Sequence, residues 1–135
     1  MNDTQVTLVG CVATRIDFRE TPGGPSARFR FAVTPRYFDR RTDAWTDGAT
    51  SFYTVWARRS LAVNLAGSVS VGEPLVVHGR LRVRDAPADG ERDRWFSADI
   101  EATAIGHDLN RGTAAFRRVV KTETPLMPNQ NAAVV

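Results

Sequence analysis

The sequence has little of the chemistry that most enzymes and metalloproteins require. Its single cysteine, Cys11, excludes an internal disulfide framework and a multi-cysteine zinc site, and leaves open only a disulfide between subunits. The two histidines, His78 and His107, are far apart in the sequence, so neither a metal nor a cofactor is expected. Neither a nucleophile elbow nor a phosphate-cradling glycine loop occurs. We therefore expect a protein that is not an enzyme.

Long apolar runs and targeting signals are also missing. No apolar stretch approaches the roughly 18 residues that a membrane span needs. The first residues, MNDTQVTLVG, lack the basic region, apolar stretch and cleavage site of a signal peptide. Apolar residues nevertheless make up 42% of the chain and charged residues 24%, which argues against wholesale disorder. These features predict one compact cytoplasmic domain without a membrane span.

Lysine is almost absent, and the positive charge is unevenly distributed. Lys121 is the only lysine, so 17 of the 18 basic residues are arginine. Residues 1–108 hold 14 arginines and 14 acidic residues and sum to zero, whereas residues 109–135 carry the whole formal charge of +3. If the first part binds a polyanion, its arginines must be separated in space from its acidic residues. A composition bias of the genome would explain the arginine excess equally well.

Alternation of apolar and polar residues predicts mainly strands. Leu61, Leu65 and Val69 recur at helical spacing and predict one short helix over residues 60–69. Residues 35–49 and 85–93 are polar and are expected to be hairpin loops. The expected strands cover residues 6–18, with a bend at Gly10, and residues 27–34, 50–57, 75–84 and 95–106.

The order of these elements predicts an all-β fold. Three strands, one helix and two strands fit a five-stranded Greek-key barrel of the OB type, with the helix between strands three and four. This domain is expected to cover residues 1–108. Residues 109–135 show no sustained pattern and predict a short, basic, largely disordered tail, with at most a short helix at 113–120.

Side chains alternate across a strand, so residue parity assigns each of them to a face. The side chains expected in the core are Phe29, Phe31, Val33, Leu81, Val83, Phe96, Ala98 and Ile100. Tyr53, Val55 and Ala57 are expected either in the core or in a subunit contact. The side chains expected outside are Arg28, Arg30, Phe52, Thr54, Trp56, Arg80, Arg82, Arg84, Trp95, Ser97 and Asp99. Large aromatic rings would thus share an outer surface with many arginines.

This combination favours a surface that binds nucleic acid. Unpaired bases stack on aromatic rings at roughly 1–3 kcal/mol per base, and arginines neutralise the adjoining phosphates. Duplex bases are already stacked, so single strands are favoured. The competing hypothesis is that Phe52 and Trp56 belong to the core and that the parity is shifted by one residue. Similarly, the aromatic loop at 37–45 either wraps over a bound strand or is an ordinary solvated hairpin.

The aligned residues resemble the bacterial single-stranded DNA-binding protein family over residues 4–108. The matching stretches are VTLVG at 6–10, FRFAVT at 29–34, SFYTVWARRSLAVN at 51–64, VGEPLVVHGRLRVR at 71–84 and DIEATAIG at 99–106. The resemblance implies an OB fold, a homotetramer and sequence-independent binding of single-stranded DNA. It also implies a role in DNA replication, recombination or repair. The alternative is an oligomeric OB-fold adaptor that binds protein, such as a primosome-type component.

The resemblance also implies particular site residues. The family's stacking aromatics fall on Phe38 and Phe52, on the non-aromatic Arg58, and near Ala86, where a ring is missing. Trp56 and Trp95, on the outward parity, are expected to compensate. The subunit contacts are expected at Val6, Leu8 and Tyr53. The expected DNA contacts are Arg28, Arg30, Arg36, Phe38, Phe52, Trp56, Arg58, Arg80, Arg82, Arg84 and Trp95.

The C-terminal residues depart from the family pattern. Replicative members carry a long linker and a short acidic tip that recruits repair and replication enzymes, whereas this sequence ends LMPNQNAAVV, with no acidic residue. Recruitment through an acidic tip is therefore not expected. The resemblance is to a shorter paralogue with a specialised role in the nucleoid, such as chromosome maintenance.

Overall fold

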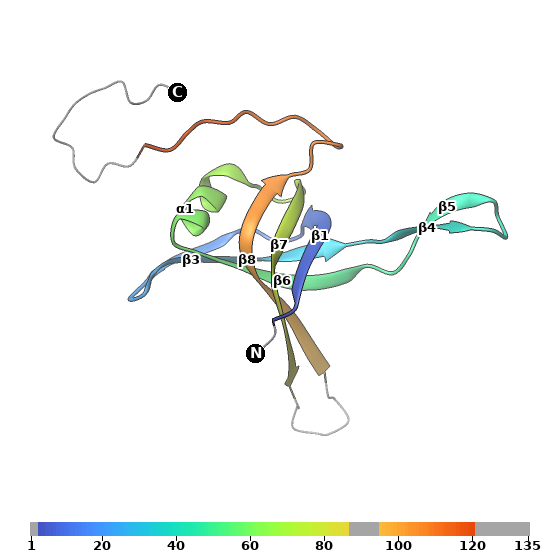
Figure 1. Cartoon of the computed structure of the whole chain (residues 1–135), viewed down its shortest axis with the longest axis horizontal. Coiled ribbons are helices and arrows are strands. Elements are labelled where there is room, and N and C mark those ends of the chain that lie inside the picture. The colour runs from blue at the N-terminus through green and yellow to red at the C-terminus, as the bar shows by residue number, and fades with distance from the viewer. Residues whose placement is uncertain (1–2, 87–94, 121–135) are drawn as a thin grey trace.

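The computed structural model describes residues 3–86 and 95–120, and of residues 84–86 and 95–96 only the backbone (Figure 1). Each strand and the helix predicted from the sequence has a counterpart, and further strands occur between them. The elements are β1 (Gln5–Val12), β2 (Asp17–Thr21), β3 (Gly24–Val33), β4 (Arg36–Asp39), β5 (Ala44–Asp47), β6 (Ser51–Arg58), α1 (Arg59–Ser68), β7 (Pro74–Ala86) and β8 (Trp95–His107).

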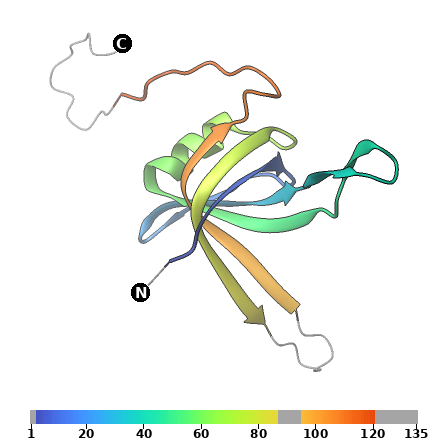
Figure 2. The same ribbon diagram turned by 45° about the vertical axis from the view of Figure 1, so that its right-hand side comes forward.

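Five strands form a closed ring, and Figure 2 shows how they surround the interior. The order is β1-β7-β8-β6-β3, and β1 also pairs with β3, which joins the two ends. Neighbouring strands run antiparallel except β6 and β8, which are parallel, and β2 continues the sheet beyond β3. This connectivity is that of the OB fold, and the predicted fold class is confirmed.

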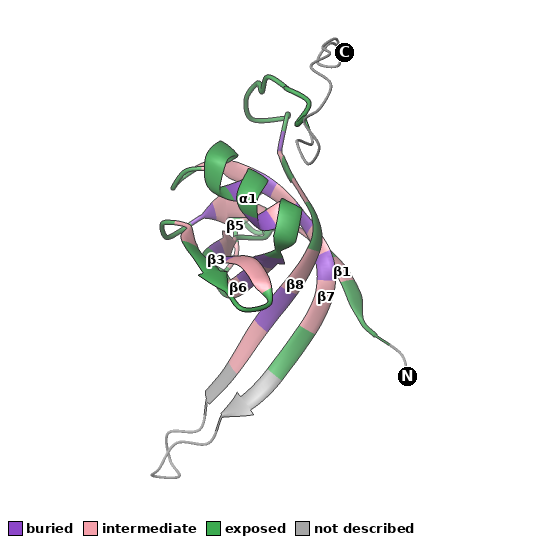
Figure 3. Cartoon of the chain, turned by 90° about the vertical axis from the view of Figure 1, so that its left-hand side faces the viewer, coloured by how far each residue is buried: buried purple, intermediate pink, exposed green. Residues whose placement is uncertain are grey.

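The core lies inside the ring and beneath the helix (Figure 3). Helix α1 packs against β3 and β6 and buries Ala62 and Leu65. The chain turns from β6 into the helix at Arg59, whose φ of 55° lies in the left-handed region. The turn uses neither a glycine nor a capping side chain, so the sequence gives no usual signal for the start of the helix. The buried apolar residues are Val12, Ala27, Phe29, Phe31, Val55, Ala57, Ala62, Leu65, Leu75, Val77 and Ile100.

The prediction of one strand over residues 6–18 is wrong. β1 pairs with β7 along most of its length and reaches β3 only at its last two residues, while β2 pairs with β3 through a tight turn. The chain therefore passes from β7 to β3 at the end of β1, and the ladder with β3 is interrupted before β2, because five residue steps from Val12 to Asp17 stand opposite three from Phe31 to Arg28. Gly10, predicted to be a bend, is a point of close approach, because a Cβ there would collide with the carbonyl oxygen of Ala32.

This close approach gives a test of the fold. We expect Gly10→Ala to lower the free energy of unfolding by about 1–3 kcal/mol, because β1 and β3 must move apart. Gly67→Ala is the matched control: nothing lies within 4 Å of its Cβ position in α1, so it should be neutral or stabilising by up to about 1 kcal/mol. Urea unfolding measures both values. Equal stability of the two variants would contradict the β1–β3 crossing.

Two further expectations need correction. Residues 35–49 are not simply a loop, because β4 and β5 form a two-stranded sheet that projects from the ring (Figure 1). Val83, expected in the core, is 61% exposed. The far ends of β7 and β8 project beyond the ring (Figure 2). Val83 is three residues from the end of β7, where a side chain with inward parity meets no core.

The remaining expectations concern the C-terminal segment and the connection between β7 and β8. Residues 109–120 form neither helix nor strand, so the short helix allowed at 113–120 is not found. The predicted loop at 85–93 begins later than expected, because residues 85 and 86 still belong to β7. Its other residues, and the rest of the predicted tail, lie outside the described residues. In the described part of the chain, no helix has the length and apolar character needed to cross a membrane.

Candidate nucleic-acid interface

Strand register places the predicted arginines and aromatics side by side on one surface, the outer face, formed by the outward side chains of β3, β6, β8 and β7. Two rows of cross-strand neighbours cross these four strands. The first row contains Arg28, Trp56, Glu101 and Arg80. The second row contains Arg30, Thr54, Asp99 and Arg82.

Phe52 and Trp56 lie on the outer face, as predicted, and the hypothesis that they belong to the core is wrong. Phe52 is 50% exposed, and Trp56 is half-buried. A guanidinium lies beside each ring: Arg30 Cζ is 5.6 Å from the Phe52 ring centroid, and Arg28 Cζ is 5.4 Å from that of Trp56. The rings are thus presented to solvent among cations.

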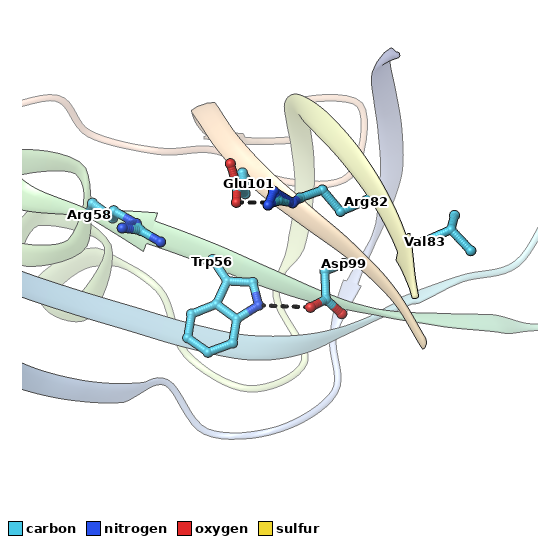
Figure 4. A pocket seen from close by; sticks show the side chains of 6 residues that line it. All are labelled: Trp56, Arg58, Arg82, Val83, Asp99 and Glu101. Atoms are coloured by element: carbon cyan, nitrogen blue, oxygen red, sulfur yellow. Dashed lines mark hydrogen bonds and ion pairs between the residues drawn. The ribbon is translucent and has the colours of Figure 1, made fainter. Parts of the chain in front are cut away.

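The indole of Trp56 is oriented by a buried carboxylate. Its Nε1 donates a hydrogen bond to Asp99 Oδ2 at 3.3 Å (Figure 4). Asp99 was expected to be exposed, but it is only 5% exposed. The side chain of Asp99 does lie on the outer face, as its parity predicted. It is buried there because side chains of the neighbouring strands, including the Trp56 ring, cover it.

Carboxylates pair with most of the arginines on this face. Arg28 contacts Asp17 at 3.3 Å, while Arg80 is paired with both Asp3 and Glu101. Glu101 also accepts the guanidinium of Arg82 at 3.4 Å. Acidic residues therefore lie among the arginines of this face instead of on another surface, and they neutralise part of its positive charge.

These pairs shift the carboxyl pKa values downward. The pKa of Glu101 is lowered mainly by its hydrogen bond to Arg80, against the opposing effect of burial, and further by the charges of Arg80, Arg82 and Arg58. The pKa of Asp17 is lowered first by Arg19 and then by Arg28. Both carboxyl groups are consequently ionised at neutral pH and hold their arginines in place.

An open groove runs along the outer face beside Trp56. One part, of about 550 Å³, is lined by Trp56, Arg58, Arg82, Val83, Asp99 and Glu101 (Figure 4). A second part, of about 530 Å³, shares Trp56, Arg58 and Glu101 and extends toward Arg80. Arg58 is exposed and makes no ion pair with a carboxylate of the described residues. The groove thus combines the Trp56 ring, the exposed guanidinium of Arg58, and Arg80 and Arg82, whose charges are partly neutralised by Glu101.

The projecting β4–β5 hairpin carries a second aromatic pair. Phe38 and Trp45 are cross-strand neighbours with ring centroids 5.7 Å apart in an edge-to-face arrangement. Trp45 is 62% exposed, yet it was not among the predicted contacts. The alternation of RYFD and AWTD would have identified it had residues 35–49 been recognised as two strands. Arg36 lies on the same hairpin and pairs with Asp47 at 3.5 Å.

The structure does not test the roles of the remaining predicted site residues. Arg84 and Trp95 lie in β7 and β8, but their side chains are outside the described residues. Val6, Leu8 and Tyr53 are half-buried and pack against the core, and their role in subunit contacts stays a prediction. Among residues 3–86 and 95–120, no group of three or more potential ligand side chains is placed to hold a metal ion.

An OB fold with exposed rings, arginines and an open groove defines a class of protein that binds nucleic acid on a barrel surface. Comparison with known proteins narrows this class. Residues 3–107 match the model of the Single-strand binding protein family. The chain belongs to this family of non-enzymatic single-stranded DNA-binding proteins.

Similar relatives come from Streptomyces. The chain is 57% identical over 128 residues to Single-stranded DNA-binding protein 1 of Streptomyces coelicolor, covering 95% of this chain and 81% of the relative. It is 58% identical over 118 residues to Single-stranded DNA-binding protein 2 of Streptomyces avermitilis, covering 87% and 73%. The crystal structure of the small single-stranded DNA-binding protein from Streptomyces coelicolor superposes with a TM-score of 0.75 at 55% identity, covering 83% of this chain and all of that one.

Proposed function

We propose that the chain coats single-stranded DNA without sequence preference through its outer face. Bases stack on Phe52 and Trp56, and neighbouring arginines contact the phosphates. The observation that carries the proposal is the half-exposed Phe52 ring, which shares a surface with Trp56 and with Arg30 and Arg58. A ring half open to water in a folded protein exposes apolar area that a stacked base would cover.

The β4–β5 hairpin extends this surface. Phe38 and Trp45 project away from the ring of strands on a narrow support, where a strand leaving the outer face can reach them. Four rings on three strands, β4, β5 and β6, provide several stacking positions, which suits a ligand that presents one base after another. The remaining proposed contacts are Arg28, Arg36, Arg80, Arg82, Arg84 and Trp95.

The proposal includes assembly and cellular role. The chain acts as a homotetramer, with Val6, Leu8 and Tyr53 at subunit contacts, and serves DNA replication, recombination, repair or a specialised task in chromosome maintenance. Family membership supports this part. A tetramer multiplies the outer faces available to one DNA strand and raises its effective affinity through multivalency.

A titration tests the proposal. We expect oligo(dT) to quench tryptophan fluorescence at low salt, because Trp45 and Trp56 lie where bases would stack. A duplex of equal length should bind far more weakly, because its bases are already stacked. An RNA oligomer measures the tolerance for a 2′-hydroxyl, and the oligomer mass is recorded alongside.

Absence of quenching and binding at low salt would refute the proposal. A complex with a partner protein that persists without nucleic acid, together with failure to bind oligo(dT), would instead favour the adaptor hypothesis.

A further inference from the structure

Glu101 lies at the centre of the cationic part of the outer face. Arg80 and Arg82 reach it from β7, one to each of its carboxylate oxygens. The charge of Arg58, on β6, also acts on it. The carboxylate therefore contacts two guanidinium groups and is influenced by the charge of a third, in the groove beside the Trp56 ring. Figure 4 shows Glu101 with Arg82 and, farther away, Arg58.

This arrangement has the chemistry of a phosphate site. A phosphodiester also presents two anionic oxygens, and guanidinium groups bind carboxylate and phosphate with the same two-pronged geometry. The site is next to an aromatic ring, as a backbone phosphate is next to its base. A phosphate and the Glu101 carboxylate cannot hold the same guanidinium hydrogens at once.

We propose that Glu101 occupies a subsite for a backbone phosphate between Arg80 and Arg82, and that this phosphate must displace it. Glu101 thereby sets the affinity of the groove for single-stranded DNA. The inference rests on the proposed function and deepens it, since it assigns a residue that limits binding at the same site.

The charged groups around Glu101 define the pH dependence. Arg80 and Arg82 contact it and the charge of Arg58 acts on it from β6, while Asp3 competes for Arg80 and Asp99 lies beside it on β8. In the free protein the arginines hold the pKa of Glu101 below its usual value of 4.5. Once a phosphate takes these arginines, the carboxyl group faces an anion and its pKa rises. Binding then takes up a proton, so affinity should increase as pH falls from neutral toward the pKa of the bound state.

The test compares Glu101→Gln with Glu73→Gln. Glu73 is a matched control, because its pKa is also lowered, here by a hydrogen bond with His107 outside the groove. We expect Glu101→Gln to bind oligo(dT) about 2- to 10-fold more tightly at pH 7.5, as expected for relief of two partly exposed ion pairs. Glu73→Gln should bind like the unmodified protein. Oligo(dT) is used because thymine does not titrate in this range.

The pH profile provides a second measurement on the unmodified protein. Its affinity should rise between pH 7.5 and pH 5, whereas the rise should be reduced in Glu101→Gln. If the unmodified protein binds but Glu101→Gln binds no more tightly and keeps the same profile, the inference is overturned. If the unmodified protein does not bind oligo(dT) at all, the proposed function fails as well. Urea unfolding of each variant confirms that the fold is retained.

Discussion

Phe52→Ala is expected to weaken the binding of oligo(dT) by about 5- to 150-fold, the equivalent of roughly 1–3 kcal/mol for one lost base stack. The ring is half exposed and lies outside the buried core, so the loss should appear in affinity and not in folding. Fluorescence anisotropy of a labelled oligo(dT) measures the effect without relying on the protein's tryptophans. A urea titration of the same sample measures stability.

Phe18→Ala is the matched control. Phe18 is 37% exposed on β2, and its cross-strand neighbour is the buried Ala27, so its ring points to the opposite side of the sheet from the outer face. The same ring is removed from the same sheet, yet affinity should stay within about twofold of the unmodified protein, since no stacked base is lost. Similar losses for both variants would show that the outer face is not the stacking surface.

Strand parity made the outer face predictable. Phe29 and Phe31 alternate with Arg28 and Arg30 in the sequence, and the structure buries the first pair and exposes the second. The period of two is strict in a central strand, because one face must cover the core. The fold class followed from the order of the elements, since few topologies accommodate three strands, a helix and two strands.

Contacts between distant residues were not predictable in this way. The pairing of Glu101 with Arg80 depends on the register of β7 against β8, which includes an irregularity between His78 and Gly79. The parity of β8 would have placed Glu101 on the outer face, but not beside a particular arginine. The burial of Asp99 likewise depends on the parallel pairing of β6 with β8, which no local pattern announces.

The sequence-based prediction was wrong at two kinds of place: where a strand changes its pairing partner, and where a strand extends beyond the core. β1 and β2 together have a continuous apolar alternation, but β1 passes from β7 to β3 at its last residues and the ladder with β3 is interrupted before β2 begins, so the structure has two strands there. Val83 follows the inward parity of β7 beyond the end of the core. The alternation of apolar and polar residues indicates on which face of the sheet a side chain lies. Whether that face is buried depends on how far the core extends along the strand.

Arg58→Gln is expected to lower the affinity for oligo(dT) by about 10- to 150-fold, as for loss of a charge-assisted contact of roughly 1.5–3 kcal/mol. Arg58 is exposed in the groove and is not paired with any described carboxylate. Its phosphate contact therefore releases a counterion, and the slope of log affinity against log salt should become shallower by about 0.7 in the variant.

Arg82→Gln is the comparison variant, because it removes an arginine that is paired with a carboxylate, whereas Arg58→Gln removes an arginine that is not. Arg82 lines the same groove but is partly neutralised by Glu101, so a phosphate that binds it frees a carboxylate that regains a counterion. The salt slope should therefore change much less than in Arg58→Gln. Arg58→Lys keeps the charge and loses the flat, two-pronged guanidinium, so it should preserve the slope and lose only the part of the affinity that depends on the guanidinium geometry. Equal slopes for Arg58→Gln and Arg82→Gln would mean that the ion pair with Glu101 does not govern how this face meets the phosphates.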